Sequence, residues 1–411
     1  MERVTDTGAG AIGARVRAIR RRRGLSLSVA AGLAGISKSY LSRLESGERA
    51  FTRRGLVEDL AYALGCSPVD LTGTPVLVPD RRSLAAASTI PALTAALHDV
   101  TLDDVPDMPT RPLAELVDLA ERAHAAADDE MRFDVLTGSA LADVIVELHV
   151  LAATGSPDER RTALEALVRL CIVAMSVAAY LGHLELALTV NRCCWDAVTR
   201  LGRLDMLGIA ATSRAIGLNR VGARRRAQKL LGDTLGTLGE APGPTSENTS
   251  VAEAAGMLHL ASAQMAARDG RLSEAETHLA EAADLARYTG ERNFLRFHFG
   301  PANVGAWQLA VAVETGRGPE RAEQLERVLD LSALGSAERR VAVHFDFARA
   351  YAQAEGARDA EALRHIDRAD RIAPLRIRHD PLARELVTEL DRRARRKVWE
   401  LSSLKNRIGV A

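Results

Sequence analysis

The chain has 411 residues, its 54 basic and 54 acidic side chains balance, and only 4% of its residues are aromatic. This length indicates two or three domains with ample chain for a core, and the alanine-rich, aromatic-poor composition favours close-packed helices over a β-rich body. Residues 1–72 carry twelve Lys and Arg against seven Asp and Glu, whereas the rest carries 42 against 47. A basic N-terminal head therefore precedes an acidic body.

We expect residues 1–11 to form a flexible tail, and the head's main motif spans residues 24–47, GLSLSVAAGLAGISKSYLSRLESG. Ser26 and Ser37 are good N-caps for two short helices, and Gly35 between the helices supplies a tight turn. Gly47 follows the second helix, where a left-handed residue is least costly. The motif therefore predicts two helices packed at a steep angle, a helix-turn-helix.

The outward face of the second helix carries Lys38, Ser39, Ser42 and Arg43, which fall within one arc near its N-terminal end. Arg and Lys can bond guanine O6 and N7, and serine hydroxyls can contact a base or a phosphate. The arginine run 20–23 on the preceding helix adds phosphate attraction that depends on salt. This face predicts a helix that enters the major groove of DNA.

Residues 12–72 resemble the Cro/C1-type, or Xre-family, helix-turn-helix regulators, through IGARVRAIRRRRG, SKSYLSRLESGE and LVEDLAYALGCSPVDL. The resemblance implies a five-helix, lambda-repressor-like DNA-binding domain with an ion pair between Arg20 and Glu45. The pattern departs at Leu27, where the family has Gln, and the loop 48–54 is about one residue longer than usual. We expect nine residues to contact DNA: Arg22, Ser26, Lys38, Ser39, Tyr40, Ser42, Arg43, Arg49 and Arg53. The alternative is a helical bundle for protein contact whose arginines form a solvated face.

We expect residues 73–112 to form a linker, since Pro75, Pro79 and Pro91 interrupt it. Amphipathic runs separated by Gly, Pro and Ser clusters then predict helices through a domain over 113–400. Their expected ranges are 113–127, 130–153, 158–181, 184–201, 204–219, 224–238, 250–268, 272–288, 302–315, 319–329, 337–354, 359–372 and 381–396.

The helices of this domain pair, and the pairs repeat. The pattern G-x-L-x-x-A at 182–187 and again at 270–275 resembles the turn and second helix of the tetratricopeptide repeat. Weaker copies place the repeat alanines at 187, 227, 275, 322 and 362, the last after a longer turn. Their separations of 40 to 48 residues exceed the roughly 34 of the standard repeat. The predicted fold is all-α: the head, then an α-solenoid of tetratricopeptide-like hairpins.

The first helix of each pair lines the concave face of such a solenoid. An inward asparagine can bond a peptide backbone, arginines can bind a carboxylate, and tryptophan can supply an apolar wall. We therefore expect an extended ligand along this face, although these residues could equally satisfy one another or face water. The candidate ligand-binding residues are Tyr180, Asn219, Arg220, Gln264, Arg268 and Trp307.

A Cro/C1-type head joined to tetratricopeptide-like repeats resembles the peptide-responsive quorum-sensing regulators of bacteria. The resemblance implies a homodimer on double-stranded DNA with a palindromic operator. It also implies a peptide or small-molecule effector that changes how the two heads are presented. The alternative is an interaction scaffold whose repeats bind a protein partner while the head tethers it to DNA.

The sequence offers no pattern typical of an enzyme. It contains no H-E-x-x-H, P-loop, dinucleotide-binding or G-x-S-x-G motif, and His298 fits a packed side chain better than a catalytic one. Its four cysteines lack metal-ligand spacing, so we expect free thiols, no metal and no cofactor. The longest nearly apolar run, 170–181, is shorter than the about 20 residues that cross a bilayer, and no secretory signal is recognisable. We therefore expect a cytoplasmic protein without a membrane span.

Overall fold

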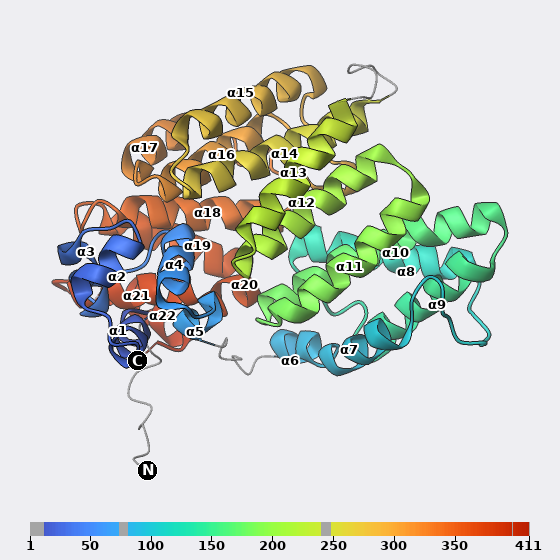
Figure 1. Ribbon diagram of the computed structural model, residues 1–411, viewed down its shortest axis with the longest axis horizontal. Helices are drawn as coiled ribbons and strands as arrows, with labels where there is room; N and C mark the ends of the chain where they lie inside the picture. The colour runs from blue at the N-terminus through green and yellow to red at the C-terminus, as the bar shows by residue number, and fades with distance from the viewer. Residues whose placement is uncertain (1–11, 74–80, 240–247, 397, 411) are drawn as a thin grey trace, which may run out of the picture.

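The computed structural model describes residues 12–73, 81–239, 248–396 and 398–410, and these residues contain helices but no β-strand (Figure 1). The tail predicted for residues 1–11 lies outside the described residues. The head, residues 12–72, has the five helices that its resemblance implies. They are α1 (Ile12–Arg22), α2 (Leu27–Leu33), α3 (Lys38–Glu45), α4 (Arg54–Leu64) and α5 (Pro68–Thr72).

The body, residues 81–410, holds the remaining helices and one 3-10 turn, η1 (Phe294–Arg296). Its helices are α6 (Arg81–Ala87), α7 (Ile90–Asp99), α8 (Leu113–Glu130), α9 (Ala140–Thr154), α10 (Pro157–Tyr180), α11 (Leu184–Leu201), α12 (Leu204–Arg220), α13 (Arg224–Gly239), α14 (Thr249–Arg268), α15 (Leu272–Thr289), α16 (Pro301–Glu314), α17 (Gly318–Val328), α18 (Ala337–Ala352), α19 (Asp359–Ile372), α20 (Pro374–Arg378), α21 (Pro381–Arg393) and α22 (Trp399–Ile408).

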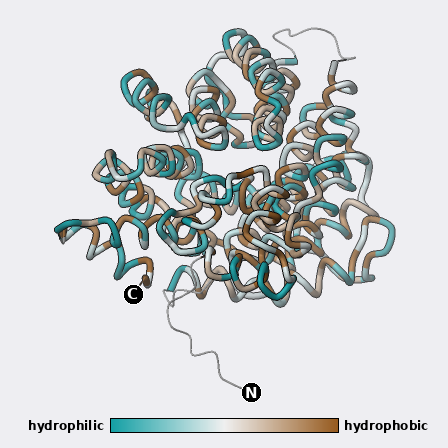
Figure 2. Tube along the Cα trace, turned by 60° about the vertical axis from the view of Figure 1, so that its left-hand side comes forward, coloured by the Kyte–Doolittle hydropathy of each residue, from teal (hydrophilic) through white to brown (hydrophobic). Residues whose placement is uncertain are grey.

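Five consecutive helical hairpins make up most of the body, and they confirm the predicted series of paired helices. The pairs are α10–α11, α12–α13, α14–α15, α16–α17 and α18–α19. The five repeat alanines are all buried, where each second helix packs against its neighbours. Glycines 182, 222, 270 and 316 turn the first four hairpins with φ between 74° and 84°, a conformation that favours glycine. Figure 2 shows hydrophobic residues gathered where the helices pack.

The predicted linker, in contrast, is wrong over residues 81–99. Residues 81–99 form α6 and α7, and α7 packs against α9 and α11 with Leu93 fully buried. Pro91 misled the prediction because it lies in the first turn of α7, where proline costs no hydrogen bond. The other Pro-rich part, residues 74–80, lies outside the described residues.

Other helix boundaries differ from the predicted ones by smaller amounts. The helix expected over 130–153 starts at residue 140, because Met131 ends α8 in a left-handed conformation with φ 52°. The short α20 and the C-terminal α22 were not predicted at all. The ten-residue α22 packs Leu401, Leu404 and Ile408 onto the body, so the solenoid ends in a cap.

One helix of the described residues, α10, is long and apolar enough to cross a membrane by length and composition alone. The apolar run seen in the sequence covers only its second half. Within the apolar window, 61% of the residues are buried in the structure, and α10 packs between α8, α9 and α11. These contacts give α10 the role of a central core helix of the body.

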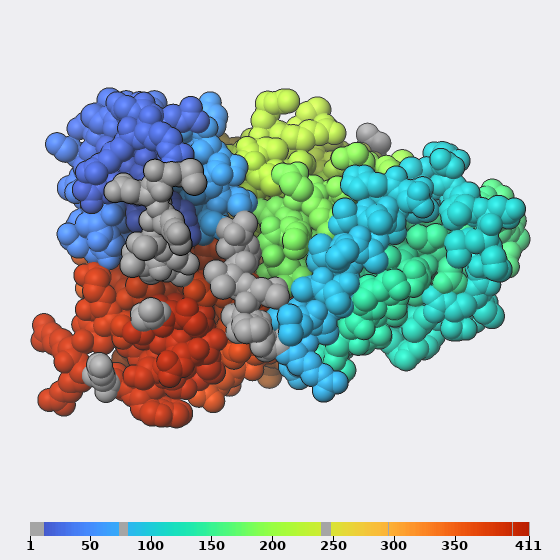
Figure 3. All heavy atoms as spheres, turned by 90° about the horizontal axis from the view of Figure 1, so that it is seen from below, coloured from blue at the N-terminus to red at the C-terminus, as the bar shows by residue number. Residues whose placement is uncertain are grey.

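The head packs directly against the C-terminal end of the body. One continuous hydrophobic cluster contains Leu41 and Phe51 of the head together with Leu386 and Leu390 of α21. In the space-filling view the blue head residues and the red C-terminal residues form one adjoining surface (Figure 3). The first and last parts of the chain therefore share a core.

Candidate nucleic-acid interface

The predicted turn geometry of the head is confirmed. The hydroxyl groups of Ser26 and Ser37 accept hydrogen bonds from Val29 N and Tyr40 N, both at 3.2 Å, so each serine caps its helix. Gly35 follows α2 with φ 66°, and Gly47 follows α3 with φ 74°. These local signals set the angle between α2 and α3.

The expected ion pair between α1 and α3 is also confirmed. Arg20 Nε and Nη2 donate to the two carboxylate oxygens of Glu45 at 2.6 and 2.7 Å, and Arg20 Nη1 donates to Leu25 O at 2.9 Å. Both side chains are buried, so this bidentate contact is strong and well shielded from solvent. It fixes α3 against α1 and thereby fixes the direction of the outward face.

That outward face is open to solvent at its N-terminal end. Lys38, Ser39 and Ser42 are exposed on α3, and Arg22 is exposed at the end of α1. The side chain of Arg43 is 43% exposed, so the arc predicted for DNA contact is accessible. A basic, hydroxyl-rich helix end of this kind can reach base edges and phosphates together.

The other predicted contacts occupy different surroundings. Ser26 is exposed, with its hydroxyl engaged as a cap, and Tyr40 is half-buried below the guanidinium of Arg49, 5.4 Å from the ring centre. Arg53 is half-buried in the loop before α4. Leu27, which replaces the usual glutamine, starts α2 half-buried against the hydrophobic core.

A residue that the sequence did not single out touches this face. Glu355 follows α18 in the body, and its carboxylate lies 3.9 Å from Arg43 Nη1 and pairs with Arg49. The backbone of Glu355 has φ 53°, a conformation that a non-glycine residue adopts rarely. A strained acidic residue of the body therefore neutralises two arginines that were predicted to contact DNA.

Comparison with known families agrees with this geometry. Residues 11–72 match a family described as a helix-turn-helix domain. The head is a helix-turn-helix domain. Comparison with curated proteins and with solved structures gave no match for the chain. The match covers all five helices of the head, including the recognition helix α3, and supports a DNA-binding regulator.

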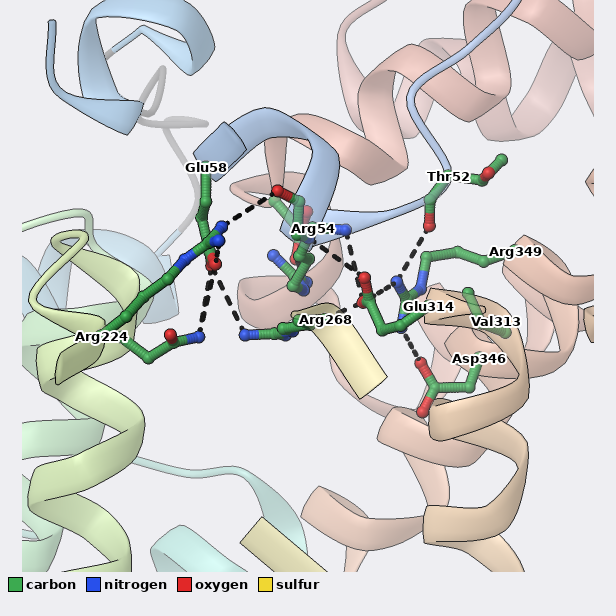
Figure 4. Close-up of polar contacts among 12 residues, drawn as sticks. Thr52, Arg54, Glu58, Arg224, Arg268, Val313, Glu314, Asp346 and Arg349 are labelled. Carbon is green, nitrogen blue, oxygen red and sulfur yellow. Dashed lines mark hydrogen bonds and ion pairs between the residues drawn. The ribbon is translucent and has the colours of Figure 1, made fainter. Parts of the chain in front are cut away.

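The helix-turn-helix domain is docked by polar contacts at the start of α4 (Figure 4). The carboxylate of Glu314, at the end of α16, accepts hydrogen bonds from Gly55 N at 3.0 Å and Arg54 N at 3.3 Å. A carboxylate is favoured there because the N-terminus of a helix carries partial positive charge. Arg349 of α18 donates to Thr52 O at 2.9 Å and to Glu314 at 3.2 Å. The loop that looked too long in the sequence is therefore the docking segment.

Two of the predicted ligand-binding residues belong to this docking contact. Asn219 Nδ2 lies 3.4 Å from both carboxylate oxygens of Glu58 on α4, and Arg268 lies 3.4 Å from the same carboxylate. The expectation of an open peptide groove at these positions is wrong, because α4 of the chain's own helix-turn-helix domain occupies that part of the concave face. Gln264 is half-buried on α14.

Three carboxylates between the head and the body, Glu58, Glu314 and Glu385, have shifted pKa values. Burial raises the pKa of Glu58, and burial raises the pKa of Glu385 to about 7 even though Ile12 N donates to it at 3.1 Å. Burial also acts on Glu314, but the guanidinium groups of Arg268 and Arg349 outweigh it and leave the pKa below its usual value. Glu314 is therefore a stable anion, whereas Glu385 titrates near neutrality.

The remaining predicted ligand-binding residues come together elsewhere. Tyr180, Arg220 and Trp307, from α10, α12 and α16, line one cavity of about 230 Å³ inside the body. These three predicted residues therefore share an internal cavity and do not lie along one open groove.

His298 and the cysteines, which the sequence analysis considered, lie in other surroundings. His298 Nε2 lies 2.7 Å from Asp128, and Arg296 lies 2.8 Å from Asp129, so the acidic run at the end of α8 is bound to the segment before α16. All four cysteines are free thiols. Within the described ranges, no group of three or more His, Cys, Asp and Glu is placed to hold a metal ion.

Proposed function

We propose that this protein is a sequence-specific transcriptional regulator that reads a palindromic operator through α3. The observation that carries the proposal is the accessible arc of Lys38, Ser39, Ser42 and Arg43 on a helix fixed by the buried Arg20–Glu45 pair. Fixed orientation matters because hydrogen bonds to base edges require side chains at set positions. We place the regulator in the cytoplasm and assign it no catalytic activity.

One helix-turn-helix domain covers only a half-site, and its contact area with DNA is small. We therefore propose that the protein acts as a homodimer whose two domains sit about one helical turn of DNA apart. The body supplies the surface for this contact and belongs with the tetratricopeptide-like regulators, in which an effector bound to the repeats controls the heads. The effector could be a peptide or a small molecule. We favour a small molecule because α4 occupies part of the concave face that an extended peptide would need.

The test is a footprint of the full-length protein on genomic fragments, including the region upstream of its own gene. A sequence-specific regulator protects a small number of palindromic sites at moderate salt, with each half-site read by one α3. Its affinity for these sites exceeds its affinity for random DNA by roughly 10³ or more. Uniform, salt-sensitive coverage of all fragments would instead identify a scaffold that the head merely tethers to DNA.

A further inference from the structure

The body contains a cavity between α8, α10, α11, α12, α16 and α18 whose walls are largely apolar. Its volume is about 230 Å³, and the apolar wall is built from Phe133, Met175, Ile216, Phe297 and Trp307. An apolar cavity of about 150 Å³ is sufficient to bind benzene, so this space can accept a ring or chain with a further polar group. The rings of Phe133 and Tyr180 lie 6.0 Å apart at one side of it.

Two arginines on this wall form no close ion pair within the described residues, and the guanidinium of Arg339 lies over the ring of Trp307, 5.7 Å from its centre. No carboxylate of the described residues lies within 4.0 Å of the guanidinium of Arg220 or of Arg339, although both side chains line the cavity. Arg339 Nε is buried and has no hydrogen-bond partner among the described residues. Arg220 is exposed, and its side chain lines two cavities.

The nearby carboxylates are already engaged. Glu338 pairs with Arg376 and accepts a hydrogen bond from Tyr180 Oη at 3.3 Å, while Asp128 is bound to His298. Burial lowers the pKa of Arg339, although the carboxylate of Glu338 acts in the opposite direction. An anion in the cavity would give each guanidinium the paired carboxylate that neither has among the described residues.

We propose that this cavity binds a small organic anion, a carboxylate with an aromatic or short alkyl body, whose carboxylate pairs with Arg220 and Arg339 while its body packs against Trp307 and Phe133. This proposal rests on the proposed function, since it names the chemical class of the effector. Arg is suited to the role because its planar guanidinium can bind a carboxylate with two hydrogen bonds.

The position of Arg220 links this site to the helix-turn-helix domain. A second cavity, of about 160 Å³, lies between the head and the body, and its head side is formed by Arg54, Val57, Pro68 and Val69. Arg220 and Tyr180 line both cavities. The positive charge of Arg54 disfavours the charged form of Arg220. A bound carboxylate offsets that repulsion and thereby stabilises the docked head.

The experiment titrates the full-length protein with phenylacetate, indole-3-acetate and octanoate by isothermal calorimetry, each against its uncharged amide. At least one carboxylate should bind tenfold or more tightly than its amide. It should also raise the melting temperature and slow hydrogen exchange in α4, because ligand binding and head docking are linked. Equal binding of acid and amide, or binding of neither, would overturn the proposal.

Arg220→Gln and Arg339→Gln should each weaken carboxylate binding at least tenfold without lowering the melting temperature of the ligand-free protein, since neither arginine forms an ion pair within 4.0 Å among the described residues. Arg287→Gln, on the exposed face of α15, is the matched control and should bind as the unaltered protein does. If either cavity variant melts well below the control, that arginine has a structural role and the assignment fails.

The two proposals fail separately. Operator protection without carboxylate binding would leave the regulator intact and remove this ligand class. Carboxylate binding that depends on Arg220, in a protein that protects no operator, would keep the site and remove the regulator.

Discussion

Glu355 of the body and Arg43 of the recognition helix are joined by a contact of 3.9 Å, and Glu355 pairs with Arg49 as well. A carboxylate thus occupies a place where a DNA phosphate would be attracted. The docked arrangement neutralises part of the positive charge on which DNA affinity depends.

Replacing this acid should strengthen DNA binding. We expect Glu355→Gln to raise affinity by up to about fivefold, since an exposed ion pair is worth about 0–1 kcal/mol. The salt dependence should become steeper because two arginines are released to phosphates. Gel-shift titrations at several salt concentrations measure both effects. Glu281→Gln, exposed on α15, is the control, and equal affinity of the two variants would show that Glu355 does not compete with DNA.

Arg43 should contribute to base recognition. Arg43→Ala is expected to cost about 1–3 kcal/mol at the operator and to relax preference at one base position. Arg22→Ala, on the neighbouring α1, should weaken binding to all sequences alike and reduce the salt slope. Binding selections with randomised operators distinguish the two. An equal loss on every sequence for Arg43→Ala would make it a phosphate contact.

Glu314 should hold the head in place. Glu314→Gln keeps an acceptor for Gly55 N but removes the anion shared by Arg268 and Arg349, which retain Glu58 and Asp346, so we expect a cost of about 1–3 kcal/mol. We expect a lower melting temperature and faster hydrogen exchange in α4. Glu320→Gln, exposed on α17, should change neither. Unaltered exchange in α4 would mean that hydrophobic contacts alone dock the head.

The stability of the docked head should depend on pH through Glu385. Because burial raises its folded-state pKa to about 7, folding takes up a proton, and the favourable contribution is lost as pH rises through 7. Glu385→Gln mimics the protonated form and still accepts from Ile12 N. Its free energy of unfolding, relative to the unaltered protein, should rise by about 1–3 kcal/mol between pH 5 and pH 8. Denaturant titrations at both pH values test this, and a constant difference would contradict it.

Cys193 should be the most reactive thiol. Its Sγ lies 3.7 Å from Cys171 Sγ and 3.4 Å from His149 Nε2, and these hydrogen bonds lower the pKa of Cys193 to about 6 despite burial. Alkylation by iodoacetamide should therefore reach half its maximal rate near pH 6. Cys66, whose pKa burial raises, is the internal control and should react only at higher pH. Mass spectrometry resolves the two sites.

The sequence predicted what local signals encode. The serine caps and the glycine turns lie within short segments of chain and were found as expected, and the Arg20–Glu45 pair, which the family resemblance implied, is also present. The five hairpins followed from glycines and alanines that recur at regular intervals. Such features depend on neighbouring residues, so a single sequence is enough to recognise them.

Contacts between distant segments could not be predicted in this way. Glu314 meets Gly55 across 259 residues, and nothing in the pattern around either residue names its partner. The same is true of Glu355 and Arg43. The docked head consequently divides the predicted ligand-binding residues into two groups. Asn219 and Arg268 contact α4. The second group lines the cavity and consists of Tyr180, Arg220 and Trp307.

The shared core of the two chain ends has a consequence for biosynthesis. Ala50 N donates to Glu389 of α21, a partner 339 residues away. At roughly 5–20 residues per second, a ribosome needs about 17–70 s to make the intervening chain. During that interval the newborn N-terminal domain has emerged while α21 does not yet exist. Each new molecule therefore passes through a period in which its recognition helix is free of Glu355. This period ends when the last helices have been made and have docked against the head.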